Sequence, residues 1–165
     1  SMHSRHWGRQ AWFLMLGLSL LLGGALITYQ IMDRENAVKV DPHDQNQVEH
    51  GQRVYDQFCA FCHGKELEGQ PDWRIRKPDG KLPAPPHDGS GHTWHHSDDT
   101  LFGIIKHGLV PPYAPEDYQS DMPAWGGSLT DEDIWAVLTF IKSHWPEEMQ
   151  KIQLDINARA QRQSR

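Results

Sequence analysis

The chain has 165 residues and a formal net charge of −6 at neutral pH, a length that suits one domain with appendages. From Asp33 to Arg165 it carries 14 Lys and Arg against 22 Asp and Glu, a balance of about −8. Because phosphate binding needs clustered cations, this acidic body argues against nucleic acid as a partner. Ser1 before Met2 is typical of a scar left by a cleaved tag, and we leave it out of the fold prediction.

Residues 11–32 form an apolar run that contains no charged side chain. A helix of this length rises roughly 33 Å, enough to cross the hydrocarbon core of a membrane. Arg5 and Arg9 precede the run and Asp33 follows it, so residues 1–10 are expected in the cytoplasm and the chain after Asp33 outside. A cleaved signal peptide is the alternative, but the run is long for one. We therefore predict a single membrane anchor.

Two helices are predicted after a polar linker at residues 33–43. The first covers residues 44–61, and the side chains on its apolar face recur every three or four positions: Val48, Gly51, Val54, Tyr55 and Phe58. The second covers residues 98–107, where Ser97 can cap the first turn and Gly108 can end the helix. Its apolar face consists of Leu101, Ile104 and Ile105.

A third helix is predicted to begin after Thr130, because Thr130 and Asp133 fit a capping box. Pro146 stops it, and its buried side carries Ile134, Val137, Leu138 and Ile141. Residues 146–165 form a C-terminal tail. This tail is expected either to fray or to form a short helix with three side chains facing inward: Met149, Ile152 and Ile156.

Two long segments, residues 65–97 and 110–128, have no helical or strand period and are rich in Pro and Gly. Such long irregular stretches are unusual in a compact domain unless something else organises them. A large apolar cofactor at the centre of the core would do so.

The only two cysteines of the chain stand in the sequence Cys59-Ala60-Phe61-Cys62-His63. Two thiols one turn apart can each add to a haem vinyl group, and the adjacent histidine can reach the iron on the same face. A thioredoxin-like redox pair would need a surrounding βαβ pattern, and a zinc site would need four ligands; the sequence shows neither. We therefore expect one covalently attached haem c, with His63 as an axial ligand.

The haem iron needs a sixth ligand, and two methionines follow the apolar run. Met122 lies in a Pro-rich segment just before the last predicted helix. Its thioether would bind iron well and raise the reduction potential. Met149 lies in the tail and is typical of core filler. Met122 is therefore the predicted distal ligand.

Five histidines gather in one part of the chain: His87, His92, His95, His96 and His107. Imidazole suits copper and zinc, so a second metal site is one reading, and His95 or His96 as the distal ligand in place of Met122 is another. A second covalent haem is excluded because no cysteines remain. We favour a fold of residues 91–96 around the haem edge, in which Trp94 and a histidine donate hydrogen bonds to haem propionates. Plain surface histidines are the remaining reading.

On these residues the chain resembles the membrane-anchored class I cytochromes c that carry one haem. Residues 59–63 match the haem-binding motif, and Met122 with Pro123 matches the loop that supplies the distal methionine. Gly51 and Tyr55 match the family's glycine and aromatic on the first helix, where the last helix crosses closely. The matching positions on that last helix are Val137 and Phe140.

The resemblance covers about residues 44–145 and implies an all-α cytochrome c fold, in which three main helices wrap around the covalently bound haem. The predicted transmembrane helix precedes this domain. In bacterial cytochromes of this type haem is attached in the periplasm, so the resemblance implies a haem domain held on the periplasmic side of the inner membrane.

The function implied is one-electron transfer in a periplasmic or respiratory chain, with redox proteins as partners and no small-molecule substrate. The alternatives are a fixed haem subunit of a larger membrane oxidoreductase, a haem sensor or peroxidase, and a metal-handling protein that uses the histidines. Residues 33–145 contain 10 basic against 19 acidic residues. A partner is therefore expected to present basic or apolar surface.

Overall fold

The computed structural model describes residues 19–20, 22–28 and 39–164, and the chain divides into two compact units, Ser1–Val38 and Lys39–Arg165. In the first unit, residues 19–20 and 22–28 are helical. Within the described ranges, no helix is long and apolar enough to cross a membrane. Most of the anchor predicted at residues 11–32 lies outside the described residues, so the anchor stays a prediction.

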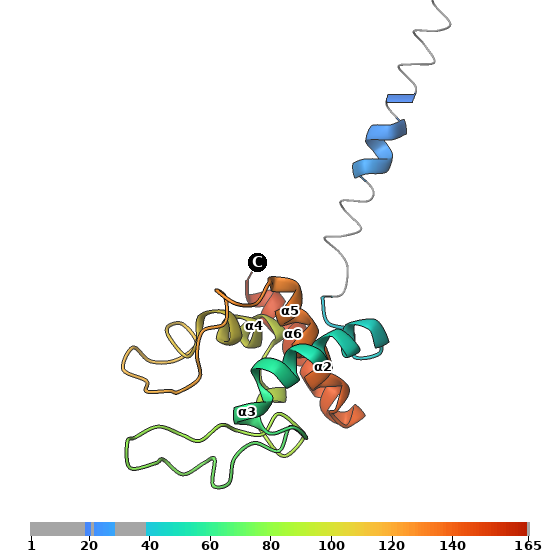
Figure 1. Cartoon of the computed structure of the whole chain (residues 1–165). Helices are drawn as coiled ribbons and strands as arrows, with labels where there is room; N and C mark the ends of the chain where they lie inside the picture. The colour runs from blue at the N-terminus through green and yellow to red at the C-terminus, as the bar shows by residue number, and fades with distance from the viewer. Residues whose placement is uncertain (1–18, 21, 29–38, 165) are drawn as a thin grey trace, which may run out of the picture. The chain divides into compact units, whose positions relative to one another are not determined.

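The second unit is built from helices joined by two long loops (Figure 1). Its elements in chain order are α2 (Gln45–Phe58), α3 (Ala60–His63), the 3-10 turn η1 (Thr93–His95), α4 (Asp98–His107), α5 (Asp131–Ser143) and α6 (Glu147–Gln163). The prediction of an all-α fold is confirmed. The first helix ends at Phe58 rather than at residue 61, because Cys59 breaks the helical path and the chain restarts in the short α3.

The other predicted helix ends agree closely with the structure because they are set by local hydrogen bonds. The hydroxyl of Ser97 accepts from the N–H of Thr100 at the start of α4, and Gly108 ends that helix with φ at 82°. At the start of α5, Thr130 and Asp133 form the predicted capping box.

The close crossing of α2 and α5 depends on Gly51. A Cβ atom at this position would lie 1.9 Å from the carbonyl oxygen of Ala136 and 2.8 Å from the Cβ of Phe140. Only glycine lets the two backbones approach this closely. One turn further along α2, the Tyr55 ring packs on the Phe140 ring with centroids 5.3 Å apart. The predicted crossing is therefore confirmed, and it fixes the helix that directly precedes the cysteine motif.

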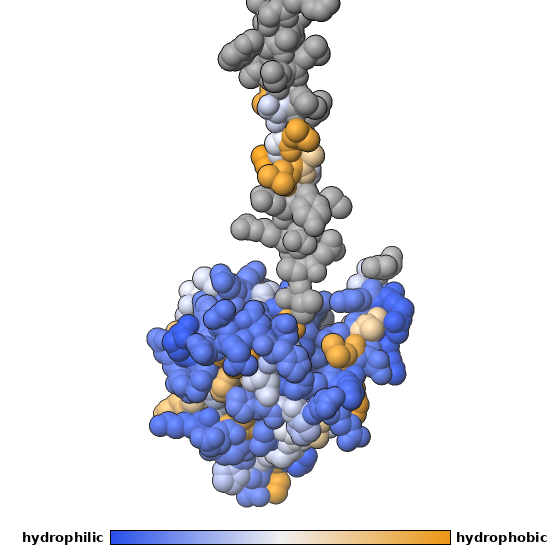
Figure 2. Space-filling model, turned by 90° about the vertical axis from the view of Figure 1, so that its right-hand side faces the viewer, coloured by the Kyte–Doolittle hydropathy of each residue, from blue (hydrophilic) through white to orange (hydrophobic). Residues whose placement is uncertain are grey.

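The predicted apolar faces meet in one core. Its buried members from the three helices include Val54, Tyr55, Leu101, Ile134, Val137, Leu138 and Ile141. Val40, which lies within the residues predicted as a linker, is buried in the same core. Figure 2 shows one face of the molecule, on which hydrophilic side chains predominate and apolar ones are scattered.

The tail forms the long helix α6, and its predicted inward face is partly wrong. Ile152 is 40% exposed, whereas Gln153 is fully buried. The Gln153 amide donates to Asp98 Oδ1 at 2.7 Å, and the Asn157 amide donates to Asp98 Oδ2 at 2.9 Å. Lys142 of α5 donates to the same carboxylate at 2.8 Å. A polar network around Asp98, rather than apolar side chains alone, selects the face that α6 buries.

Candidate functional site

Both predicted attachment cysteines are free thiols, Cys59 at the end of α2 and Cys62 within α3. Cys59 is half-buried at the break between α2 and α3, and Cys62 is exposed one turn further on. Burial raises the pKa of the Cys59 thiol to about 12, and the neighbouring Cys62 adds to this effect. This position suits a sulfur that ends as an uncharged thioether, because a thiolate there would be costly.

His63 is buried in α3, and one nitrogen of its ring is already committed. Its Nδ1 lies 2.8 Å from the carbonyl oxygen of Pro85. Because a carbonyl oxygen only accepts, Nδ1 must carry the proton and Nε2 must present its lone pair. Burial lowers the pKa of His63, although the hydrogen bond to Pro85 opposes the shift. A neutral ring with a free Nε2 and an oriented Nδ1–H is what a metal-ligating histidine requires.

Pro85 is brought close to His63 because two loop segments after the motif, residues 67–69 and 85–87, pack against each other. The N–H of Gly69 donates to the carbonyl oxygen of His63 at 2.7 Å. A Cβ atom at Gly69, where φ is 67°, would lie 2.4 Å from the nitrogen of Pro86. The N–H of His87 donates to the carbonyl oxygen of Leu67 at 2.8 Å. These contacts bring the diproline beside the His63 ring.

His87 stacks on His63, with ring centroids 4.0 Å apart and planes 25° from parallel. Its Nδ1 lies 2.8 Å from the hydroxyl of Thr93, and the Trp145 indole donates to its carbonyl oxygen. Burial, together with the neighbouring His63, holds the pKa of His87 well below its ordinary value. The sequence placed His87 only within the histidine cluster and did not predict this contact, which follows from its position two residues after Pro85.

Trp94 lies in η1 and stacks on His95, with ring centroids 3.7 Å apart. Its indole Nε1 is buried, and among the described residues it has no hydrogen-bond partner. A buried N–H without an acceptor is costly, so an acceptor supplied by a bound group would compensate it. A haem propionate is such an acceptor, and the role of Trp94 beside a propionate stays a prediction.

Met122 is half-buried in the segment between α4 and α5. The segment is fixed at both ends. Tyr113 fills the space over Gly103 of α4, where a Cβ atom would lie 2.0 Å from its ring. Trp125 packs edge-on against Phe58 of α2, with centroids 5.4 Å apart. The loop that carries Met122 is thus attached to the helix of the cysteine motif, while ligation by Met122 stays a prediction.

The other histidines of the cluster make ring contacts with residues other than His63. His92 stacks on Trp73 and lies edge-on to His96, whereas the ring of His107 is parallel to that of Tyr113. In the described part of the chain, no group of three or more His, Cys, Asp or Glu side chains is arranged to hold a metal ion. A second metal site is therefore not among our proposals.

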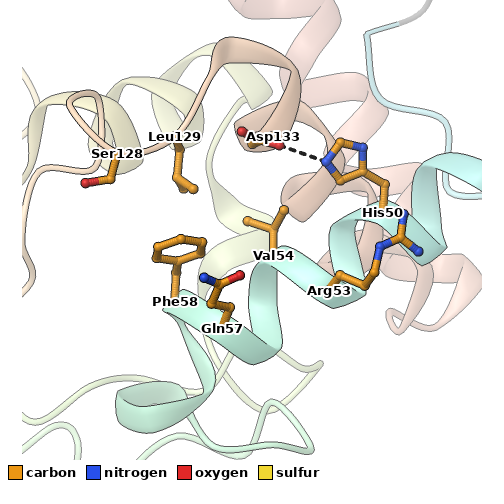
Figure 3. Close-up of a pocket in the computed structure, with 8 residues that line it drawn as sticks. All are labelled: His50, Arg53, Val54, Gln57, Phe58, Ser128, Leu129 and Asp133. Atoms are coloured by element: carbon orange, nitrogen blue, oxygen red, sulfur yellow. Dashed lines mark hydrogen bonds and ion pairs between the residues drawn. The ribbon is translucent and has the colours of Figure 1, made fainter.

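Figure 3 shows an open pocket between α2 and the segment around the start of α5. Its apolar side consists of Val54, Phe58 and Leu129, and at the other side His50 Nε2 lies 2.8 Å from Asp133 Oδ1. None of the predicted haem-site residues lines it, so we assign it no part in the site.

These residues fit a covalently attached haem. Among the described residues, the two thiols are unpaired and the Trp94 N–H has no acceptor, while His63 presents Nε2. An all-α domain in which Cys-x-x-Cys-His directly follows a helix that a later helix crosses at a glycine is a cytochrome c domain.

The family model described as "Cytochrome C oxidase, cbb3-type, subunit III" matches residues 46–141, more than half of the chain. The chain therefore belongs to this family, and membership implies a covalent haem c and electron transfer in respiration. No curated protein and no solved structure matches the sequence significantly.

Proposed function

We propose that this chain is a membrane-tethered one-electron carrier. Its haem is attached through Cys59 and Cys62 and ligated by His63 and Met122. The observation that carries the proposal is the buried His63 ring, whose Nδ1 is committed to the Pro85 carbonyl at 2.8 Å directly after the two thiols. When bound, the haem supplies an iron that changes between the ferric and ferrous states.

The residues of the chain set the conditions for that exchange. The Pro85 carbonyl holds the His63 ring in one orientation, so little rearrangement accompanies the gain or loss of an electron. With both His63 and Met122 bound to the iron, no position would remain open for a substrate, which favours electron transfer over catalysis. The buried Trp94 N–H, which has no acceptor among the described residues, supports a role in stabilising a haem propionate.

The attachment is tested by replacing Cys59 and Cys62 with alanine, singly and together. Each single change should weaken haem staining on a denaturing gel, and the double change should abolish it. A double variant that still stains would end the attachment assignment.

Distal ligation is tested by Met122→His, which should keep six-coordination but lower the reduction potential, because imidazole favours ferric iron more than a thioether does. Met149→Leu is the matched control, since Met149 is the other methionine of residues 39–164 and its side chain packs near Gly89. A potential unchanged in Met122→His would point to a histidine as the distal ligand.

A fixed subunit of a membrane oxidase is the second candidate, and the name of the matched family favours it. We propose that the apolar run at residues 11–32 holds the domain on the periplasmic side of the inner membrane, beside such a complex. Purification in mild detergent separates the two candidates. Oxidase subunits retained in stoichiometric amount indicate a fixed subunit, whereas a free chain indicates a tethered carrier.

The negative charge of residues 33–145 indicates what kind of surface a redox partner should present. With 10 basic against 19 acidic residues at 33–145, we propose a partner with basic or apolar surface around its redox centre. Electron transfer to such a partner should slow as salt rises. A rate that increases with salt would show that the charges repel.

A further inference from the structure

The tip of the first long loop presents two lysines side by side. The N–H of Lys77 donates to the carbonyl oxygen of Lys81 at 2.9 Å, and the N–H of Gly80 donates to the carbonyl oxygen of Lys77 at 2.8 Å. Gly80 supplies the positive φ of 84° that this turn requires. The Arg76 guanidinium closes the turn by donating to the Gly80 carbonyl at 2.6 Å. Three cationic side chains are therefore gathered in six residues.

One carboxylate from the second long loop lies between these cations. Asp121 Oδ2 lies 3.0 Å from the Lys77 ammonium, and Asp121 Oδ1 contacts the Lys81 ammonium. Nearby, the Arg76 guanidinium lies over the Tyr118 ring, 5.7 Å from its centroid. We call these five residues the cross-loop cluster: Arg76, Lys77, Lys81, Tyr118 and Asp121. In Figure 1 the two loops project from the same side of the helices.

This cluster lies next in the chain to the predicted distal ligand, because Asp121 directly precedes Met122. Tyr113 and Trp125 fix the two ends of the second loop, and the cross-loop cluster joins the intervening part to residues 76–81. We propose that the cross-loop cluster holds the loop in the conformation that keeps Met122 on the iron, with Asp121 as a positioning residue. This inference rests on the proposed His63 and Met122 ligation.

The physical basis is electrostatic. Without Asp121, the two ammonium groups of the turn would repel each other, and only the Asp79 carboxylate, 3.8 Å from the Lys77 ammonium, would remain to offset that repulsion. The pairs are only partly shielded from water, since the side chain of Lys77 is 39% exposed and that of Asp121 is 56% exposed. Each pair is therefore weak and screened by salt. The cluster should bias the loop and adjust how readily Met122 is displaced, without being required for folding.

The test is an imidazole titration of the ferric, haem-loaded full chain in detergent at low salt. Asp121→Asn should bind imidazole about two- to fivefold more tightly than the unmodified chain, as expected for losing exposed ion pairs. Asp117→Asn is the matched control, because Asp117 carries the same charge in the same loop and its side chain makes no ion pair within the described residues. High salt should remove most of the difference between Asp121→Asn and the unmodified chain.

A charge exchange provides a second variant. The triple change Lys77→Glu, Lys81→Glu and Asp121→Lys should return imidazole affinity toward that of the unmodified chain. Hydrogen exchange of the peptide that contains Met122, which needs no ligand assignment, should be faster in Asp121→Asn than in Asp117→Asn.

The outcomes separate this proposal from the proposed function. If the unmodified chain lacks the absorption band of methionine-ligated ferric haem, the Met122 assignment and the function built on it fail. If the band is present but both asparagine variants bind imidazole equally and exchange equally, the cross-loop cluster has no positioning role and this inference alone is overturned.

Discussion

Gly51→Ala offers a direct test of how α2 is held against α5. In an exposed helix this substitution stabilises by about 1 kcal/mol, because alanine restricts the unfolded backbone and favours the helix. At residue 51 we expect the opposite sign. The new Cβ would lie 1.9 Å from the Ala136 carbonyl oxygen and 2.5 Å from the Ala136 carbonyl carbon. Both are backbone atoms, which cannot swing aside as a side chain can.

The size of the effect follows from that overlap. Ordinary van der Waals contact begins at 3.4 Å, so the Cβ and the Ala136 oxygen must separate by about 1.5 Å, the difference between 3.4 and 1.9 Å. If the helices moved apart to make this room, each neighbouring contact that opened by about 1 Å would lose up to half of its dispersion energy. Overpacking of this kind costs about 3 kcal/mol at the upper end, and the helix preference of alanine returns about 1 kcal/mol. The net loss should be about 2 kcal/mol.

Urea unfolding of the haem-loaded chain, followed by far-ultraviolet circular dichroism, measures this loss. Gln52→Ala is the matched control, since Gln52 is the next residue of α2, is exposed, and has a helix preference close to that of alanine. The control should change the free energy of unfolding by less than about 0.5 kcal/mol. A Gly51→Ala chain as stable as the control, or more stable, would refute the close crossing.

Three further substitutions test other parts of the domain. Lys142→Met should destabilise the chain by about 3 kcal/mol in urea unfolding, because it leaves the Asp98 carboxylate, 20% exposed, without its ammonium at 2.8 Å. Lys151→Met, which removes an exposed lysine, should have little effect. Thr130→Ala should cost about 1 kcal/mol, and Thr130→Ser should cost less because the hydroxyl remains. The backbone N–H and hydroxyl of Thr130 hold the pKa of Asp133 below its ordinary value, so this contribution is present at neutral pH and is lost as pH falls through the folded pKa. Trp94→Phe should lower the reduction potential relative to Trp73→Phe, because a propionate without its indole donor favours ferric iron; equal potentials would end the role of Trp94.

The helices could be predicted because their signals are local. A serine or threonine that accepts from the first turn and a glycine that ends the last turn lie within one helix length of each other, as Ser97 and Gly108 do around α4. The cysteine motif is local for the same reason, since its chemistry depends on a fixed spacing within five residues.

Contacts between distant residues were beyond this kind of prediction. The apolar pattern of the tail indicated Ile152 as inward, yet Gln153 is buried because it donates to Asp98, 55 residues earlier in the chain. No periodicity in either segment indicates that a glutamine and an aspartate will meet. The ion pairs of Asp121 with Lys77 and Lys81 are of the same kind.

The diproline at residues 85 and 86 is a feature of the sequence from which the hydrogen bond to His63 could have been predicted. Proline has no N–H, so this segment cannot join a ladder of backbone hydrogen bonds, but its carbonyl oxygens can still accept. Glycines approach it from both sides: a Cβ atom at Gly69 would lie 2.4 Å from the Pro86 nitrogen, and one at Gly91 would lie 2.1 Å from the Pro86 oxygen. A rigid acceptor enclosed by two glycines after a Cys-x-x-Cys-His motif is well suited to orient the histidine, because fixing its backbone costs little entropy. The Pro-rich composition that suggested an irregular loop therefore also supplies the carbonyl that fixes His63.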